Sequence, residues 1–236
     1  MDFATPQLRE TDNIAAARRR RAMIEVGIAY ALILVVIWSP RPAQKILWWV
    51  AVAAVAAMAA ASFNGLQSTG LRTKNFLRSF WIVGVALLLA VSAVAIAMWM
   101  ETLRMPAGGA WGFMKAYWAY ALWACVQQFL LQAFFLPRFL LLFRNNKAAA
   151  FFAASLFALA HVPNPILTPL TLVWGVAACL LFLRYRNLYP LALAHACLGL
   201  AVTVTVPGHI NHNMRVGLGY LTWHGHIHRP PISPQP

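Results

Sequence analysis

The chain has 236 residues, of which 61% are apolar and only 10% are charged, and its mean hydropathy is +0.66. A water-soluble domain carries about 25% charged residues, so this composition excludes a soluble enzyme, and it also excludes a disordered tail and a secreted disulfide scaffold. The net charge of +14 comes from basic residues at the edges of apolar stretches, which argues against a nucleic-acid partner. The composition predicts an all-α, polytopic transmembrane helix bundle whose partner is the lipid bilayer.

Apolar runs of nearly membrane-spanning length recur along the chain. We predict about seven spans, within a range of six to eight, at residues 22–38, 46–63, 80–100, 116–136, 148–161, 166–183 and 189–206. A short interfacial helix is expected near residues 70–79, where apolar and basic side chains mix. The predicted regions are therefore a basic segment (1–21), N-terminal transmembrane helices (22–115), a transmembrane core (116–206) and a His-rich polar tail (207–236) that we expect to pack poorly.

The basic residues are distributed unequally between the two sides of the predicted bundle. With the N-terminus in the cytoplasm, 13 of the 19 Lys and Arg residues lie in inside segments, including the run Arg18–Arg21. Cytoplasmic loops carry an excess of Lys and Arg, so we predict a cytoplasmic N-terminus and an outside C-terminus.

Polar side chains inside the predicted spans are costly to bury and usually mark function. They are Gln127, Gln128 and Gln132 in the fourth span, His161 at the end of the fifth, and His195 in the seventh. At 1.5 Å per residue, Gln128, His195 and His161 lie roughly 13–20 Å from the membrane edge, which is one central layer. Such residues also serve as hydrogen-bonding links between helices, each contributing about 0.6 kcal/mol. Their shared depth favours a site.

Carboxylates are scarce, and this limits the chemistry of the C-terminal half. The chain contains only Asp2, Glu10, Asp12, Glu25 and Glu101, so the last 135 residues have none. A carboxylate pair or an acidic metal ligand in that half is excluded by counting.

Three segments resemble the motifs of the CPBP family, which comprises CAAX prenyl proteases and bacteriocin-processing proteins. The segment from Gln127 to Gln132 is similar to its first motif, Glu-Glu-x-x-x-Arg. Phe157 to His161 is similar to the second, Phe-x-x-x-His, and the approach Asn187-Leu-x-Pro to His195 is similar to the third. The resemblance covers roughly residues 116–200, so the region 116–206 is the CPBP-like core. It implies helices enclosing a polar cavity, in a bacterial or archaeal plasma membrane.

In active members, the resemblance implies that a first-motif Glu activates water and that the two histidines assist or stabilise the oxyanion. The catalytic positions here are His161, His195, Gln127 and Gln128, and Gln132, Phe157, Asn164 and Gly199 are expected to support the cavity. Gln replaces both Glu residues and the Arg of the first motif, and Gly199 replaces an Asn. Gln cannot act as a general base near neutral pH, which should cost about 10²–10⁴-fold in rate.

Three functions remain open. The first is an intramembrane endopeptidase that processes lipidated or membrane peptides with His161, His195 and another base. The second is a catalytically silent relative that binds a lipidated or membrane-embedded peptide in the same cavity. The third is a small transporter or channel, for which the sequence shows no repeat.

We expect no cofactor, and a divalent metal only as a minor alternative, because two histidines and an amide lack the anionic ligand common in catalytic zinc sites. The tail offers five further metal-ligand candidates: His209, His212, His224, His226 and His228. His-rich tracts can bind metal, but a loose solvated tail with adventitious affinity is the favoured interpretation.

The predicted orientation can be tested with a reporter fused to the C-terminus. An odd number of spans after a cytoplasmic N-terminus places the reporter outside, where an externally active enzyme such as alkaline phosphatase gives signal. A fusion active only in the cytoplasm contradicts this orientation or the span count.

Overall fold

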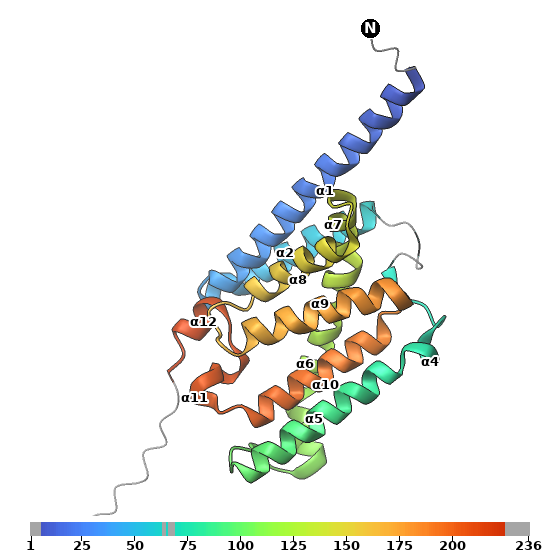
Figure 1. Ribbon diagram of the computed structural model, residues 1–236. Helices are drawn as coiled ribbons and strands as arrows, with labels where there is room; N and C mark the ends of the chain where they lie inside the picture. Colours follow the sequence, from blue (N-terminus) through green and yellow to red (C-terminus); the bar gives the residue numbers. More distant parts are fainter. Residues whose placement is uncertain (1–5, 63–64, 66–68, 225–236) are drawn as a thin grey trace, which may run out of the picture.

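The computed structural model describes residues 6–62, 65 and 69–224, and these form helices without any β-strand (Figure 1). In chain order they are α1 (Pro6–Trp38), α2 (Arg41–Ala61), α4 (Phe76–Ser79), α5 (Trp81–Trp99), α6 (Gly109–Phe129), the π-helix η1 (Leu130–Phe135), α7 (Leu136–Leu142), α8 (Asn146–Leu159), α9 (Leu167–Tyr185), α10 (Tyr189–Thr205), α11 (Gly208–Asn211), the 3₁₀-helix η2 (His212–Met214) and α12 (Gly217–Leu221). The predicted all-α class is confirmed.

Each of the seven predicted spans coincides with a helix, although the lengths differ. Within the described residues, five helical stretches are long and apolar enough to cross a membrane, and α10 with its continuation, bent by 118°, makes a sixth. Helix α8 has 14 residues and is about 21 Å long, shorter than a hydrocarbon core of about 30 Å. The chain is a helical integral membrane protein. Its five or six candidate spans are roughly consistent with the seven that the sequence predicts.

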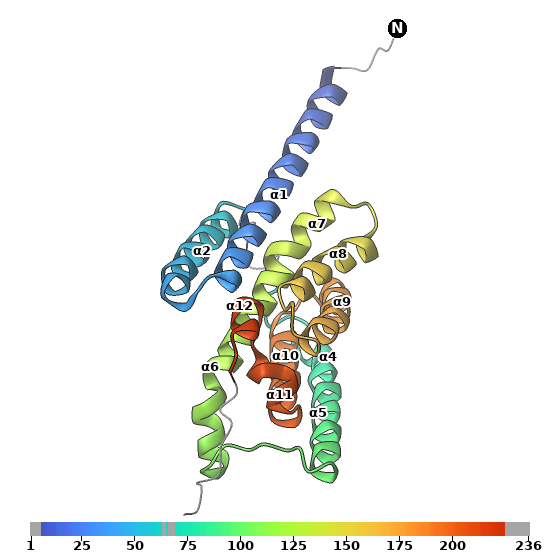
Figure 2. The same cartoon turned by 90° about the vertical axis from the view of Figure 1, so that its left-hand side faces the viewer.

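Helix α10 lies at the centre of the helices that form the candidate site. It packs against α5 and α6 and touches α9, while α9 packs closely on α8 (Figures 1 and 2). Small residues permit the α8–α9 approach: a Cβ added to Gly175 of α9 would lie 3.0 Å from the Cβ of Ala154. Close contact between small residues is the usual way in which helices associate within lipid.

Helix α1 begins at Pro6, so most of the predicted basic segment 1–21 is helical. The N-terminal end of α1 extends well beyond the other helices (Figure 2). It is joined to α7 by an ion pair between Glu25 Oε2 and Arg138 Nη2, which are 2.6 Å apart. Arg21 also binds Glu25, at 2.7 Å. Arg138 is only 5% exposed and lies over the ring of Phe134. The ion pair therefore fixes α1 to the core.

The predicted interfacial helix near 70–79 is helical only over Phe76–Ser79. The residues before it are bound to the α9–α10 connection instead. Asn187, which is 1% exposed, donates to the carbonyls of Arg72 and Lys74 at 2.9 and 3.0 Å.

The expectation of a poorly packed tail is wrong for residues 208–221. These residues form α11, η2 and α12, and α12 packs against α1. The backbone N–H of Gly217 donates to the carbonyl of Val162 at 2.9 Å, so the tail turns back to the end of α8. The polar composition that suggested a loose tail supplies hydrogen bonds inside the fold.

Removing one partner of the Glu25–Arg138 pair leaves a buried charge alone, which costs about 3–5 kcal/mol. We expect Glu25→Leu to lower thermal stability in detergent strongly, as measured by intrinsic Trp fluorescence, while Glu10→Leu at an exposed position has little effect. The double variant Glu25→Leu/Arg138→Leu should lose less than the sum of the two single variants. Additive losses would show that the pair is not coupled.

Candidate functional site

The helix that carries the three glutamines is widened just after Gln128. Residues Leu130–Phe135 form the π-helix η1, and Pro137 follows within the first turn of α7. Proline has no N–H and its ring crowds the carbonyl four residues earlier, so an α-helical hydrogen bond is lost here. In a π-helical turn the backbone hydrogen bonds join residues five positions apart, so the backbone groups around the proline can still be paired. Such turns are frequent at functional sites.

Gln128 links this helix to α10 through a buried hydrogen bond. Its Nε2 lies 3.0 Å from Nδ1 of His195, and both side chains are buried. Gln132, one turn later, donates from Nε2 to Oε1 of Gln128 at 3.4 Å, while its own Oε1 has no partner among the described residues. Two amides thus form a hydrogen-bonded chain that ends on an imidazole.

His161 sits just past the end of α8, held by its own helix. Its Nδ1 lies 2.7 Å from the backbone carbonyl of Phe157. The ring of Phe157 contacts both histidines edge-on, with centroids 5.0 Å from His161 and 5.8 Å from His195. The ring of Phe157 is therefore in contact with both imidazoles.

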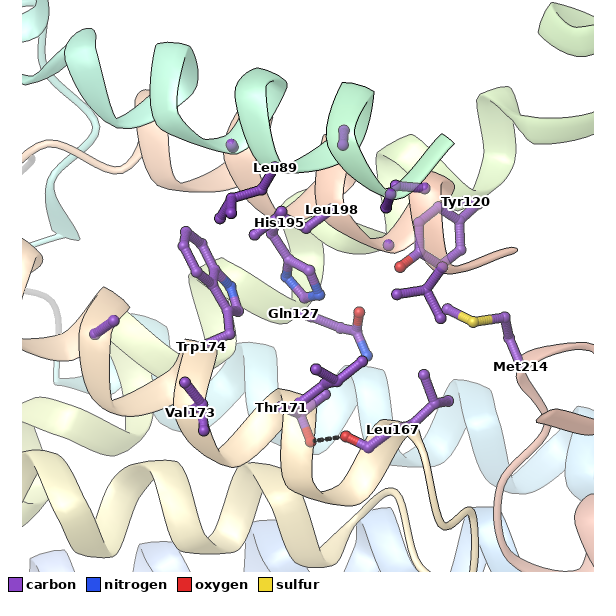
Figure 3. A pocket seen from close by; sticks show the side chains of 18 of the residues that line it. Leu89, Tyr120, Gln127, Leu167, Thr171, Val173, Trp174, His195, Leu198 and Met214 are labelled. Carbon is purple, nitrogen blue, oxygen red and sulfur yellow. Dashed lines mark hydrogen bonds between the residues drawn. The ribbon is translucent and has the colours of Figure 1, made fainter. Parts of the chain in front are cut away.

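His161, His195 and Gln127 line one cavity of about 940 Å³ between α5 and α9, with α10 as its floor (Figure 3). Its rim is apolar and exposed: Leu89 of α5 is 55% exposed and Val173 of α9 is 70% exposed. In a membrane protein such a rim faces acyl chains. The cavity is thus an apolar groove with a few polar groups in its wall, the usual composition of a ligand site.

Gly199 lines the cavity and has no side chain. An added Cβ would lie 1.7 Å from the hydroxyl oxygen of Tyr120, so the phenol of α6 occupies the space beside α10. Tyr120 also lines the cavity, as does Trp174, whose ring centroid is 6.2 Å from that of His195. Sequence reasoning missed both residues because aromatic side chains in apolar runs look like ordinary membrane-facing residues.

Asn164 was expected to support the cavity, and its side chain instead holds the C-terminal segment. Fully buried, its Nδ2 donates to the carbonyls of Asn211 and Arg215 at 2.9 and 3.0 Å. Its Oδ1 accepts from the N–H groups of Ile166 and Leu167 at the start of α9. Asn164 is not among the cavity-lining residues.

The donor set does not fit a catalytic metal of the usual kind. Such zinc sites have three protein ligands, and no group of three or more His, Cys, Asp or Glu side chains able to hold a metal occurs in the described part of the chain. Among the tail candidates, His212 stacks on Tyr220 with centroids 3.9 Å apart, while His209 and His224 are exposed. His226 and His228 lie outside the described residues.

The geometry defines the class: a membrane-embedded helical bundle with two histidines and a glutamine in the wall of a lipid-facing cavity. Residues 109–201 match the family model described as type II CAAX prenyl endopeptidase Rce1-like. No curated protein and no solved structure matches the chain. Residues 109–201, which contain all three motifs, belong to the CPBP family, and the chain is an integral membrane, CAAX-protease-like protein.

Asn164 gives a prediction about the C-terminal segment. Asn164→Ala leaves buried backbone groups unpaired, which costs about 1–3 kcal/mol for each such group. We expect residues 208–221 to separate from α9, so that trypsin cleaves faster after Arg215. Asn146→Ala, at an exposed position on α8, is the control. Equal cleavage rates in the two variants would show that Asn164 does not hold this segment.

Proposed function

We propose that the protein binds a lipidated or membrane-embedded peptide in the cavity between α5 and α9 without hydrolysing it. The exposed apolar rim, which includes Leu89 and Val173, suits a prenyl chain or an apolar helix arriving from the bilayer. The polar groups of Gln127, His161 and His195 suit the peptide backbone. A cytoplasmic N-terminus, an outside C-terminus and a bacterial or archaeal plasma membrane belong to the same proposal.

The observation that carries this proposal is the amide of Gln128 bonded to His195. In active members of the family, the resemblance implies a glutamate in the first motif that removes a proton from water. An amide of the same size holds the histidine but accepts no proton near neutral pH.

Other carboxylates do not replace it. Among the described residues that line the cavity there is no Asp or Glu. Glu25 is bonded to Arg21 and Arg138 between α1 and α7 and is not a lining residue.

Peptide hydrolysis is the second candidate, and it is favoured by the two histidines in one cavity. Histidine is the side chain whose unperturbed protonation changes near neutral pH, so either imidazole is a chemically suitable base. In this alternative one histidine activates water, and the other donates a hydrogen bond to the carbonyl oxygen.

A single experiment separates the two candidates. A farnesylated peptide, labelled fluorescently at its N-terminus, is added to protein in nanodiscs, and binding is followed by anisotropy and cleavage by mass spectrometry. We expect wild-type protein to bind without cleavage. The variant Gln127→Glu/Gln128→Glu/Gln132→Arg should bind and cleave, because a positioned general base raises rates by about 10²–10⁴-fold.

Gln44→Glu provides the matched control, since it makes the same chemical change on α2, outside the cavity. Cleavage by wild-type protein that disappears in His161→Ala or His195→Ala would establish hydrolysis and refute the silent assignment. Absence of binding in all variants would refute both candidates.

A further inference from the structure

The two histidines of the cavity are held in opposite tautomers. Nδ1 of His161 contacts the carbonyl oxygen of Phe157 at 2.7 Å. A carbonyl oxygen only accepts hydrogen bonds, so Nδ1 of His161 carries the hydrogen. Its Nε2 then carries no hydrogen and has a free lone pair, and this atom has no partner within the described residues. His161 offers the cavity an acceptor.

His195 is held the other way by the amide chain. Gln132 donates to Oε1 of Gln128, which leaves the NH₂ group of Gln128 to face Nδ1 of His195. With the amides in this orientation Gln128 bonds both Gln132 and His195, and the carbonyl oxygen of Gln132 is left without a partner among the described residues. Nδ1 of His195 therefore accepts, and its Nε2–H is the donor left for a ligand.

The surroundings of this pair are uncharged. No Lys, Arg, Asp or Glu is found among the described residues that line the cavity. An ion placed there has no opposite charge to compensate its loss of water, so both the imidazoles and the bound group are favoured as neutral species. Both histidines line the same cavity, so its wall offers one acceptor and one donor to a neutral group that has one N–H and one C=O.

We propose that the His161–His195 pair selects an uncharged peptide or carboxamide group and discriminates against a free carboxylate. This rests on the proposed function, because the lipid part of the ligand is taken to lie in the apolar groove. A peptide group donates its N–H to Nε2 of His161 and accepts from Nε2–H of His195. A carboxylate has no hydrogen for His161 and brings an uncompensated charge, and a methyl ester satisfies only His195.

Three ligands that differ only in this group and carry no other amide test the proposal: 3-(farnesylthio)propanamide, the corresponding methyl ester and the corresponding free acid. Each displaces a fluorescent farnesylcysteine carboxamide from wild-type protein in phosphatidylcholine nanodiscs, with a correction for partitioning into empty nanodiscs. We expect the carboxamide to bind about 10- to 100-fold more tightly than the acid. The advantage of the carboxamide over the ester should be about three- to tenfold.

Two variants assign these preferences to individual atoms. His161→Phe removes the acceptor, so the carboxamide should lose its advantage over the ester. His195→Phe removes the donor and should weaken both ligands by a similar factor. His209→Phe, an exposed histidine outside the cavity, serves as the control and should change neither ratio.

The outcomes distinguish this inference from the proposed function. If the farnesylated ligands bind but the acid binds as tightly as the carboxamide, the selection is refuted and lipid binding in the cavity stands. If none of them binds, lipid binding is refuted and the selection with it. The comparison on wild-type protein decides the question even if a histidine variant does not fold.

Discussion

The hydrogen bond between Gln128 and His195 is the interaction on which the rest of the site depends. Inside a bilayer no water pairs with a polar side chain, so each buried donor or acceptor needs a partner from the protein. Gln128 is fully buried and meets this requirement by bonding both Gln132 and His195. Because these residues come from one continuous helical stretch and from α10, the same bonds that satisfy the amides also fix the position of an imidazole in the cavity wall.

The structure separates two kinds of polar interaction that one membrane protein needs. The charged pair of Glu25 and Arg138 joins α1 to α7 and does not line the cavity. Around the cavity, amides and imidazoles replace charges. A buried ion pair must recover a large desolvation penalty, whereas amide bonds recover a smaller one. The charge therefore serves helix assembly, and the site consists of neutral groups.

The sequence predicted some of this arrangement well, for physical reasons. Hydropathy located the helices, since the length of an apolar run follows directly from bilayer thickness. The structure brings His161 and His195 to one cavity and bonds Gln128 to His195. Depth along a helix does not give rotation about its axis, so only the structure shows that Gln127 faces the cavity while Gln128 faces α10. The folded tail was missed because Asn164 binds it through long-range bonds that leave no periodic pattern. The π-helix was missed because Pro137 alone predicts a kink and not its form.

The amides at 128 and 132 are best understood as a linked pair. A carboxylate at 128 alone would be buried beside a neutral Gln132 and a neutral His195, with no cation near it in the cavity wall. An arginine at 132 alone would be an equally isolated charge. A charge introduced at only one of these two positions is costly because it is buried without a partner. A carboxylate at 128 together with an arginine at 132 would compensate each other, as Glu25 and Arg138 do elsewhere in the chain. Hydrolysis that uses a glutamate and silent binding that uses amides are thus two self-consistent versions of one cavity, separated by intermediates that each leave a charge unpaired in lipid.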